Sequence, residues 1–391
     1  MGRHLLVALA LAGCSFHHGL APDGGGGGGE DSVSPVIDAA IDAPLGCGAT
    51  QIVARGSHSC ALMRDDTVWC WGANDRGQSG VGSAGTIDCS GTPCVMTPTE
   101  VALPGKASAL GAGQVDSCAT AGGSVYCWGA NGVGEFGTGQ TGDSTTPVAV
   151  GARGNATAIA GGYNTMCSLA GTTVSCSGGN LYGEVGNNSD NETDSVYALT
   201  SLTASALTMA YGDTCAIIAD GAVDCWGANG HHEIDGTGAD AEAPVAVSPA
   251  VSGAIALAGG YDQICALFGD STAGCWGNDT DGQVDGVALS GVKGMTLVSL
   301  TGVAEIAAGF DHTCARLGDG SVTCWGTGYT GLQAVALPAP AQAIATGDDH
   351  DCAIVGDGKV VCWGQDDFGQ LGNGALITGA QPPTMATLCA E

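Results

Sequence analysis

Short apolar segments alternate with glycine-rich turns along most of the chain. Ala/Gly-rich segments such as 159–162 and 306–309 precede pairs of cysteines, and a proline opens a further apolar segment at 147–150. Between them lies a polar turn of the type Asn-x-x-Gly-Gln-Leu-Gly, clearest at 366–372. Short apolar runs bounded by turn residues are typical of β-strands. The pattern predicts an all-β chain built from repeated four-stranded units.

Seven cysteine pairs mark seven copies of this unit. The pairs are Cys60 with Cys70, Cys118 with Cys127, Cys167 with Cys176, Cys215 with Cys225, Cys265 with Cys275, Cys314 with Cys324, and Cys352 with Cys362. The second cysteine is followed by Trp-Gly in six copies, whereas the third copy has Ser177-Gly178. A typical copy has about 49 residues, but the first carries an insertion at residues 79–100 and the sixth is shortened.

Each cysteine pair is predicted to close a β-hairpin. Between Cys118 and Cys127 the central residues are Gly122-Gly123, which suit a two-residue turn in which both positions need positive φ. Where the pair is one residue further apart, Asp-Gly at 220–221, 319–320 or 357–358 suits a three-residue loop with glycine in the left-handed region. In both registers the cysteines lie opposite each other, close enough for a disulfide bond.

Such units cannot bury their faces alone, and radial stacking of them forms a propeller. The pattern Ala-Gly-x-x-His-x-Cys-Ala…Asp-Gly-x-Val-x-Cys-Trp-Gly is well shown by residues 308–326. It resembles the regulator-of-chromosome-condensation repeat, over about residues 47 to 389. The resemblance implies a seven-bladed β-propeller. Secreted relatives include the β-lactamase-inhibitor protein II type.

The remaining cysteines predict two more disulfide bonds among the 19 cysteines. Cys89 and Cys94 lie together in the insertion. Cys47 and Cys389 map to adjacent positions of the repeat, so in a closed ring they should meet and join the N- and C-terminal strands. Closing that loop removes on the order of 5 kcal/mol of unfolded-state entropy, and each hairpin bridge roughly 2–3 kcal/mol. So many bridges imply an oxidising compartment, and the spacing is not that of a zinc site.

The N-terminal residues are predicted to direct export and anchoring. Residues 1–13 form a signal peptide with a basic start and an apolar run too short to span a bilayer. Leu11-Ala-Gly-Cys14 resembles a bacterial lipobox, which implies lipidation of Cys14 and an outer-membrane place in the bacterial cell envelope. An ordinary signal peptide with a chance cysteine is the alternative. Residues 14–46, with an unbroken glycine run, are expected to be a flexible tether, and residues 47–391 the propeller.

Charge limits the choice of partner. Asp and Glu outnumber Lys and Arg by 39 to 9, and the net charge is −30. Nucleic-acid binding needs a basic surface, so we predict no nucleic-acid partner, and membrane contact only through the lipid. A basic partner or divalent cations remain compatible with this charge, although the acidity also serves simply to keep a Gly/Ala-rich surface soluble.

Side chains with catalytic or metal-binding chemistry occur at ordinary repeat positions. Three histidines stand two residues before the first cysteine of their copies, where a structural hydrogen bond is expected: His58, His312 and His350. His231-His232-Glu233 with Asp235 suggests a metal site but aligns with the repeat turn, as does the calcium-loop-like stretch 278–285. Because no nucleophile elbow, zinc-protease motif or phosphate-binding loop occurs, we predict no enzyme activity, no cofactor and no metal.

The main candidate binding surface is a set of four aromatic residues. They stand four residues before the first cysteine in four successive copies: Tyr163, Tyr211, Tyr261 and Phe310. Equivalent positions of successive blades share one face and one radius, so the rings should form an arc, with Asp213, Asp262 and Asp311 close by. Aromatic residues rimmed by charge are common in protein interfaces. Packing of the rings between blades is the alternative.

These observations favour a monomeric, envelope-anchored module that binds a protein through one face of a propeller. A secreted-type enzyme inhibitor resembling β-lactamase-inhibitor protein II is a narrower alternative, and an enzyme that uses the central channel is a third. The nucleotide exchange and chromatin binding of the family's namesake are not expected here. Export would separate the chain from a nuclear GTPase, and its acidity disfavours chromatin.

Overall fold

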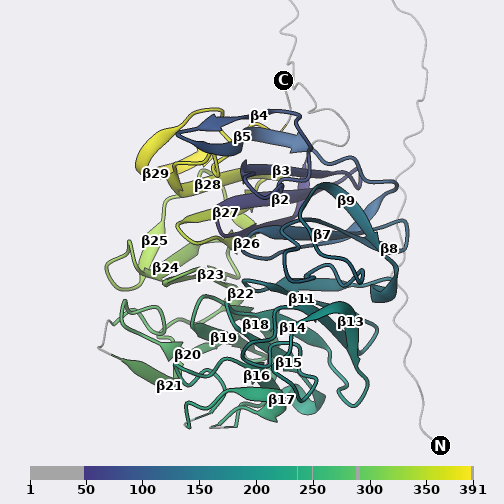
Figure 1. Ribbon diagram of the computed structural model, residues 1–391. Coiled ribbons are helices and arrows are strands. Elements are labelled where there is room, and N and C mark those ends of the chain that lie inside the picture. Colours follow the sequence, from purple (N-terminus) through teal and green to yellow (C-terminus); the bar gives the residue numbers. More distant parts are fainter. Residues whose placement is uncertain (1–47, 236, 249, 288–290, 389–391) are drawn as a thin grey trace, which may run out of the picture. The chain divides into compact units, whose positions relative to one another are not determined.

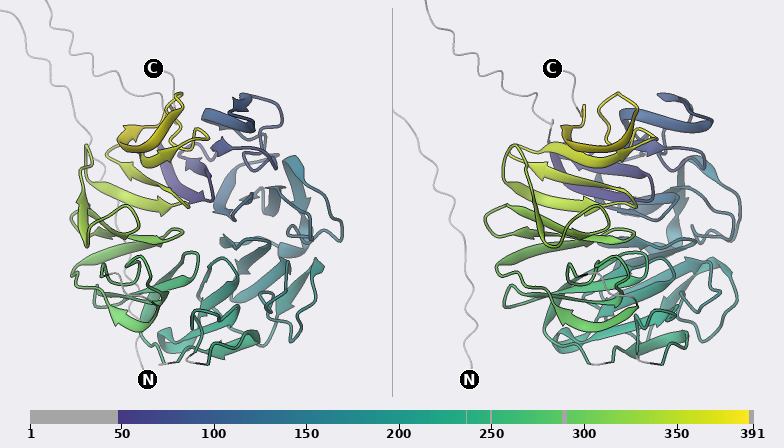
Figure 2. Two further views of the ribbon diagram at one scale, coloured as in Figure 1. Left: turned by 60° about the vertical axis from the view of Figure 1, so that its left-hand side comes forward. Right: turned by 90° about the vertical axis from the view of Figure 1, so that its left-hand side faces the viewer.

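The computed structural model describes residues 48–388, except 236, 249 and 288–290. The chain divides into a unit of residues 1–42 and a second unit of residues 43–391, which contains the described part. Seven antiparallel sheets in the second unit surround a central axis, one sheet for each repeat (Figure 1; Figure 2). This confirms the predicted all-β, seven-bladed propeller. No helix in the described part is long or apolar enough to cross a bilayer.

The strands of each blade follow sequence order from the channel outward, except in blade 1, where β5 pairs with β3 and β4 lies outermost. Blade 1 comprises β1 (Ala49–Arg55), β2 (His58–Met63), β3 (Val68–Ala73), β5 (Thr92–Glu100) and β4 (Thr86–Cys89). Blade 2 comprises β6 (Ala107–Ala112), β7 (Asp116–Ala121), β8 (Ser124–Gly129) and β9 (Ser144–Val150), followed by the 3-10 helix η1 (Gly151–Arg153). Blade 3 comprises β10 (Ala158–Gly161), β11 (Thr165–Ala170), β12 (Thr173–Gly178) and β13 (Thr193–Leu199).

The other four blades repeat this order. Blade 4 comprises β14 (Ala206–Met209), β15 (Asp213–Ile217), the 3-10 helix η2 (Ala219–Gly221), β16 (Val223–Gly227) and β17 (Ala241–Ala246). Blade 5 comprises β18 (Ala254–Gly259), β19 (Gln263–Phe268), β20 (Ala273–Asn278) and β21 (Val292–Leu297). Blade 6 comprises β22 (Val303–Ala308), β23 (His312–Leu317), β24 (Val322–Gly326) and β25 (Gln333–Val335). Blade 7 comprises β26 (Ala341–Thr346), β27 (His350–Val355), β28 (Lys359–Asp366) and β29 (Ile377–Met385).

The second and third strands of every blade form the predicted disulfide-bonded hairpin. In all seven hairpins the two cysteines pair directly across the strands, with Cα–Cα distances of 4.0–4.1 Å. From blade 1 to blade 7 the bonded pairs are Cys60 with Cys70, Cys118 with Cys127, Cys167 with Cys176, Cys215 with Cys225, Cys265 with Cys275, Cys314 with Cys324, and Cys352 with Cys362. All seven pairings are those predicted from the spacing of the cysteines.

The insertion and the hairpin turns also agree with the sequence analysis. An eighth disulfide bond, Cys89–Cys94, joins β4 to β5 in the insertion, as predicted. The turn residues Gly122 and Gly123 both have positive φ, at 58° and 83°. Glycines of the longer hairpin loops do so too: Gly221, Gly320 and Gly358.

Blade 1 packs against blade 7 and closes the ring. Strand β1 contacts β26 and β27, and the N–H of Ala49 donates to the carbonyl oxygen of Gly358 at 2.8 Å. Ala49 and Leu388, which lie near the two ends of the described chain, belong to one core cluster. The predicted Cys47–Cys389 bond lies outside the described residues, as do Cys14 and the tether.

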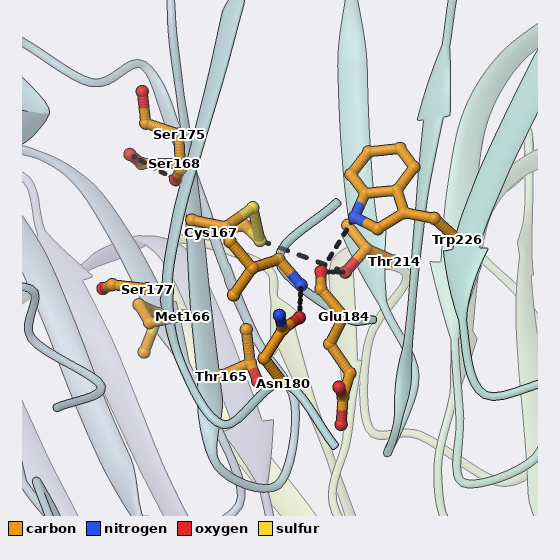
Figure 3. The surroundings of a disulfide bond; sticks show 12 residues. Thr165, Met166, Cys167, Ser168, Ser175, Ser177, Asn180, Glu184, Thr214 and Trp226 are labelled. Carbon is orange, nitrogen blue, oxygen red and sulfur yellow. Dashed lines mark hydrogen bonds between the residues drawn. A yellow bond between two sulfur atoms is a disulfide. The ribbon is translucent and has the colours of Figure 1, made fainter. Parts of the chain in front are cut away.

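The tryptophan of each Cys-Trp-Gly lies buried and donates its indole N–H to the preceding blade. In blade 4, the Trp226 indole and the Thr214 hydroxyl both donate to the carbonyl oxygen of Glu184, at 2.8 Å and 3.0 Å (Figure 3). Four other tryptophans donate to the equivalent carbonyl of their neighbours: Trp71, Trp128, Trp276 and Trp325. The shortened sixth copy lacks this turn, and Trp363 donates instead to the Tyr329 hydroxyl at 2.9 Å.

Blade 3 has no tryptophan at this position, and other side chains donate to the carbonyl oxygen of the preceding blade. Its Ser177 hydroxyl donates to the carbonyl oxygen of Glu135 at 2.8 Å, and the guanidinium of Arg153 donates to that oxygen at 3.1 Å. Arg153 is only 2 % exposed and also donates to the carbonyl oxygens of Met166 and Ser175, both at 2.9 Å. A buried arginine thus replaces the missing indole, and burial lowers its pKa to about 10.

Candidate functional site at one mouth of the channel

Seven residues, one from each blade, form a ring where the channel-lining strands end; we call this ring the rim. The rim consists of Gly56, Gln114, Tyr163, Tyr211, Tyr261, Phe310 and Asp348. Backbone hydrogen bonds pass from blade to blade along it, because the N–H of Tyr163 donates to the carbonyl of Tyr211 at 2.9 Å and that of Tyr211 to Tyr261 at 3.1 Å. Glycines before the rim permit this approach. A Cβ atom on Gly309 would lie only 2.5 Å from the carbonyl oxygen of Gly347.

Four successive rim residues form a continuous aromatic arc. The ring centroids of Tyr163 and Tyr211 are 4.5 Å apart, those of Tyr211 and Tyr261 4.3 Å, and those of Tyr261 and Phe310 3.9 Å. Tyr163 is 42 % exposed and the other three rings are partly buried. The rings therefore stack on one another along the rim, which brings all four of the sequence-selected residues together on one surface.

Arg55 extends from the end of β1 into the channel mouth. Its guanidinium donates to the carbonyl oxygens of Gly259, at 2.6 Å, and Met209, at 3.0 Å, both across the ring in blades 5 and 4. Burial lowers the pKa of Arg55, and the carboxylates of Asp348 and Asp213 oppose that shift. The channel behind it has a volume of about 240 Å³ and is lined mainly by Ala, Ile and Gly of the seven innermost strands. Arg55 thus links blade 1 to blades 4 and 5 across the channel.

Acidic side chains surround the arc. Burial raises the pKa values of Asp213, Asp262 and Asp348, and it raises the pKa of Asp311 to about 6. Neighbouring carboxylates add to the effect on Asp311, chiefly Asp281 and then Asp262. On the other half of the rim, the Gln114 side-chain amide donates to the Asp348 carboxylate. The mouth of the channel therefore gathers several carboxyl groups around partly exposed aromatic rings, and burial disfavours the charged form of these carboxyl groups.

The three repeat histidines join neighbouring blades. His58 Nε2 lies 2.7 Å from the Ser117 hydroxyl of blade 2, and His350 Nε2 lies 2.7 Å from the Ser59 hydroxyl of blade 1. Burial lowers the pKa of His58 to about 3 and that of His350 to about 4. These side chains are structural partners between blades, as the repeat position predicted.

His312 differs from the other two because its partner is a carboxylate. Its Nε2 lies 2.8 Å from Asp351 Oδ1, and the Tyr329 hydroxyl donates to Asp351 Oδ2 at 2.8 Å. Burial opposes a charge on His312, but Asp351, with Asp349 and Asp348, raises its pKa. The nearby Cys314 is in a disulfide bond and has no thiolate to offer a metal ion.

The two turns that suggested metals in the sequence have different surroundings. Around 278–285, the ammonium of Lys293 lies 2.8 Å from Asp279 and 2.7 Å from Asp285, and so supplies the positive charge itself. In the other turn, Asp235 accepts hydrogen bonds from Asn229 and Thr237. The structure places Asp262 of blade 5 beside His231 in its stead, with 3.2 Å between His231 Nδ1 and Asp262 Oδ2.

Comparisons with known proteins agree with this architecture. Residues 49–78, 303–331 and 341–370 match the regulator of chromosome condensation (RCC1) repeat. The fold is similar to that of human WBSCR16, with 20 % identity, a TM-score of 0.71, and coverage of 82 % of this chain and 95 % of that one. Yeast RCC1 (Prp20), solved with Kap60 bound, gives 18 % identity, a TM-score of 0.70, and coverage of 81 % and 82 %. A further structure of Prp20p from Saccharomyces cerevisiae gives 16 %, 0.70, and 86 % and 87 %. The chain carries repeats of this type in a propeller of this fold.

The sequence analysis missed the role of Arg55 and the contact between Asp262 and His231. Arg55 ends a strand that is otherwise uncharged, in a chain with only nine Lys and Arg residues, and that rarity was the available signal. Asp262 stands beside Tyr261, but its meeting with His231 depends on how blades 4 and 5 are placed. Neither contact follows from local periodicity.

Proposed function

We propose that this chain is a protein-binding propeller and that the aromatic arc is its contact surface. One observation carries the proposal: four aromatic rings from four blades stack in a continuous, partly exposed row at the mouth of the channel. Large rings with few rotatable bonds supply much of the binding energy in protein interfaces. A monomeric propeller has no structural need to gather them on an open surface.

The surroundings of the arc favour a partner that presents basic side chains. Burial raises the pKa of Tyr261, and the carboxylates of Asp262, Asp311 and Asp348 raise it further. The hydrogen bond to Asp143 and, least of all, Tyr163 raise the pKa of Arg76, which is already paired with Asp143 at 3.0 Å. A Lys or Arg of the partner would meet both a ring face and carboxylates, so cation–π and charge contacts would reinforce each other.

Propellers of the same fold give this proposal a precedent. Yeast RCC1 (Prp20) was solved with Kap60 bound, and the binding of Prp20p to Gsp1p and histones was studied with its structure. Kap60, Gsp1p and histones are partners of the yeast protein. For this chain we propose only that the propeller serves as a platform that binds proteins, with no catalytic step of its own.

We further propose that the propeller is anchored in the bacterial envelope through lipidated Cys14, with residues 14–46 as its tether. The apolar run before Cys14 and the glycine run after it support this placement. Mass spectrometry of the N-terminal peptide should find acyl chains on Cys14, and Cys14→Ser should release the protein from membranes. An unmodified Cys14 would refute the anchoring while leaving the binding proposal intact.

Cross-linking capture from envelope extract tests the binding proposal. The bait is the full-length protein, compared with Tyr163→Ala/Tyr211→Ala and with the control Tyr197→Ala. Tyr197 is 41 % exposed, like Tyr163, but lies on the outer strand β13. We expect a partner that the wild type and the control both capture and the arc variant does not, with capture weakened by salt. Equal capture by all three baits would overturn the assignment of the arc.

A further inference from the structure

A second candidate site lies at the edge of the arc, between blades 4 and 5. His231 Nδ1 lies 3.2 Å from Asp262 Oδ2 and 3.6 Å from Glu233 Oε1. One donor atom from each of these three residues lies within 4.8 Å of the others. The Glu233 side chain is 2 % exposed, whereas that of His231 is 45 % exposed, so the group is anchored in the protein and open to solvent.

Asp213 adds a buried carboxylate to the surroundings of this group. It is 1 % exposed, and burial raises its pKa; the negative charges of Glu233 and Asp262 raise that pKa further, whereas Arg55 lowers it. Among the described residues, its one hydrogen-bond-range side-chain contact is Cys215 Sγ at 3.8 Å. That sulfur is in a disulfide bond and has no proton to donate. A buried carboxylate needs a donor or a cation, and Arg55 is a cation that acts on Asp213. Asp213 therefore adds to the negative charge beside the group without being needed as one of its ligands.

The repeat shows that this combination is specific to one interface. Asp213 and these three residues occupy four fixed positions of the repeat. Asp213 stands two residues before the first cysteine of its blade, and His231 and Glu233 lie in the turn after Trp-Gly. Asp262 stands three residues before the first cysteine of the next blade. At other interfaces that have this turn, the same positions hold, in the same order, His58, Arg76, Gln78 and Val115 between blades 1 and 2; Asp116, Val133, Glu135 and Asn164 between blades 2 and 3; and Thr165, Tyr182, Glu184 and Gly212 between blades 3 and 4. They hold Gln263, Asp281, Gln283 and Asp311 between blades 5 and 6, and His350, Phe368, Gln370 and Ser57 between blades 7 and 1. In that comparison, only the interface between blades 4 and 5 has one imidazole and three carboxylates.

The turn after Trp-Gly contains the same hydrogen bond at several interfaces, whether the accepting side chain is Glu or Gln. At Glu233, the side chain accepts a hydrogen bond from the N–H of His231 at 2.9 Å. Gln283 and Gln370 accept the corresponding bond at 2.9 Å and 2.8 Å. A neutral amide is therefore sufficient to build the turn, and the charge of Glu233 is not required by the fold.

We propose that His231, Glu233 and Asp262 bind one divalent transition-metal ion, Zn²⁺ or Mn²⁺, between blades 4 and 5. Ligand atoms lie about 2.0–2.2 Å from zinc, so the present separations need only a small rotation of the half-exposed imidazole. Carboxylate and imidazole donors together suit these ions better than Ca²⁺ or Mg²⁺, which prefer oxygen alone. Asp262 directly follows Tyr261 of the arc, so a bound ion would fix the position of the residue next to Tyr261. This proposal does not depend on a protein partner.

Calorimetric titration of the untagged full-length protein, stripped with EDTA, tests the site with Zn²⁺ and with Mn²⁺. We expect one ion per chain and, for Glu233→Gln and Asp262→Asn, at least tenfold weaker binding. The matched controls are Glu135→Gln, at the Glu233 position of blade 2, and Asp281→Asn, at the His231 position of blade 5. Both should bind like the wild type.

Two further measurements keep the result interpretable. Thermal unfolding without metal should show that Glu233→Gln keeps the wild-type Tm, because Gln builds the same turn elsewhere, and that the ion raises Tm in the wild type only. Because His17 and His18 also offer imidazoles, the titration is repeated with both replaced by Ala, and one ion should still bind. No saturable binding of either ion would overturn the proposal. So would binding that Glu233→Gln and Asp262→Asn leave unchanged, or binding that disappears with His17 and His18.

Discussion

The two halves of the rim share one backbone arrangement and differ in their side chains. Blades 3 to 6 contribute the aromatic arc, whereas blades 7, 1 and 2 contribute Asp348, Gly56 and Gln114. The N–H of Asp348 donates to the carbonyl of Gly56 at 2.9 Å, the same distance as in the aromatic pair Tyr163 and Tyr211. The blade-to-blade hydrogen bond forms with or without a ring. The backbone arrangement therefore does not require the aromatic side chains, which is in keeping with the proposal that they bind a partner.

The ring closes in the half without aromatics, and the largest expected effect lies there. Replacing Cys47 and Cys389 with Ser should lower the free energy of unfolding by up to roughly 5 kcal/mol, because their bridge would close nearly the whole chain. The control Cys89→Ser/Cys94→Ser opens a loop of a few residues and should cost only about 2 kcal/mol. Urea unfolding measures both. Free thiols at 47 and 389 in non-reducing mass spectrometry would contradict the closure.

Arg55 links the two halves and should have the next largest effect. Arg55→Met removes charged hydrogen bonds to the carbonyls of Met209 and Gly259 and should cost about 3 kcal/mol. Arg64 lies exposed in the loop after β2, so Arg64→Met is the control and should change stability by less than about 0.5 kcal/mol. Equal losses in urea unfolding would show that the contact across the channel carries no stability.

The two halves should respond to pH with opposite signs. His58 and His350 have folded pKa values of about 3 and about 4, below the ordinary value of 6.5. The unfolded chain therefore binds their protons first, so their contribution falls as the pH drops from about 6.5 towards 4. The pKa of His312, in blade 6, is raised, so its contribution is full below about 6.5 and is lost as the pH rises through the folded pKa.

Glutamine variants separate these contributions from those of the buried carboxylates. Between pH 7 and 4, His58→Gln/His350→Gln should lose less stability than the wild type, whereas His312→Gln should lose its disadvantage as the pH rises. Tm measured at each pH unit gives the comparison. Parallel curves for the three proteins would rule out an effect of these histidines on pH-dependent stability.

The smallest expected effect comes from extending the arc. Gln114 adjoins Tyr163 on the rim, and its N–H donates to the carbonyl of Gly162. Gln114→Tyr should fold with a change of less than about 1 kcal/mol, because the backbone bond is kept and only the contact with Asp348 is lost. Circular dichroism and urea unfolding check this. A large loss would mean that the rim selects its side chains for stability.

The sequence was sufficient to predict the features that depend on residues close together in the chain or on the repeat itself. Cysteine spacing with Gly122-Gly123 or Asp-Gly turns predicted the hairpins and their bonds, and counting repeats predicted the blades. The arc followed from one repeat position. Contacts between non-equivalent positions of different blades could not be predicted, because they depend on how the copies meet across the ring. Sequence showed that Ser177 replaces a tryptophan, but not that Arg153 fills its place, and it paired His231 with Asp235 rather than with Asp262.

The affinity of the captured partner for arc variants tests the central claim most directly. Tyr163→Ala/Tyr211→Ala/Tyr261→Ala should weaken binding at least a hundredfold, because each ring of a binding hot spot contributes about 1–2 kcal/mol or more. The same variant should remain folded, and Tyr197→Ala should bind like the wild type. A triple variant that unfolds, or that binds its partner with wild-type affinity, would contradict the account.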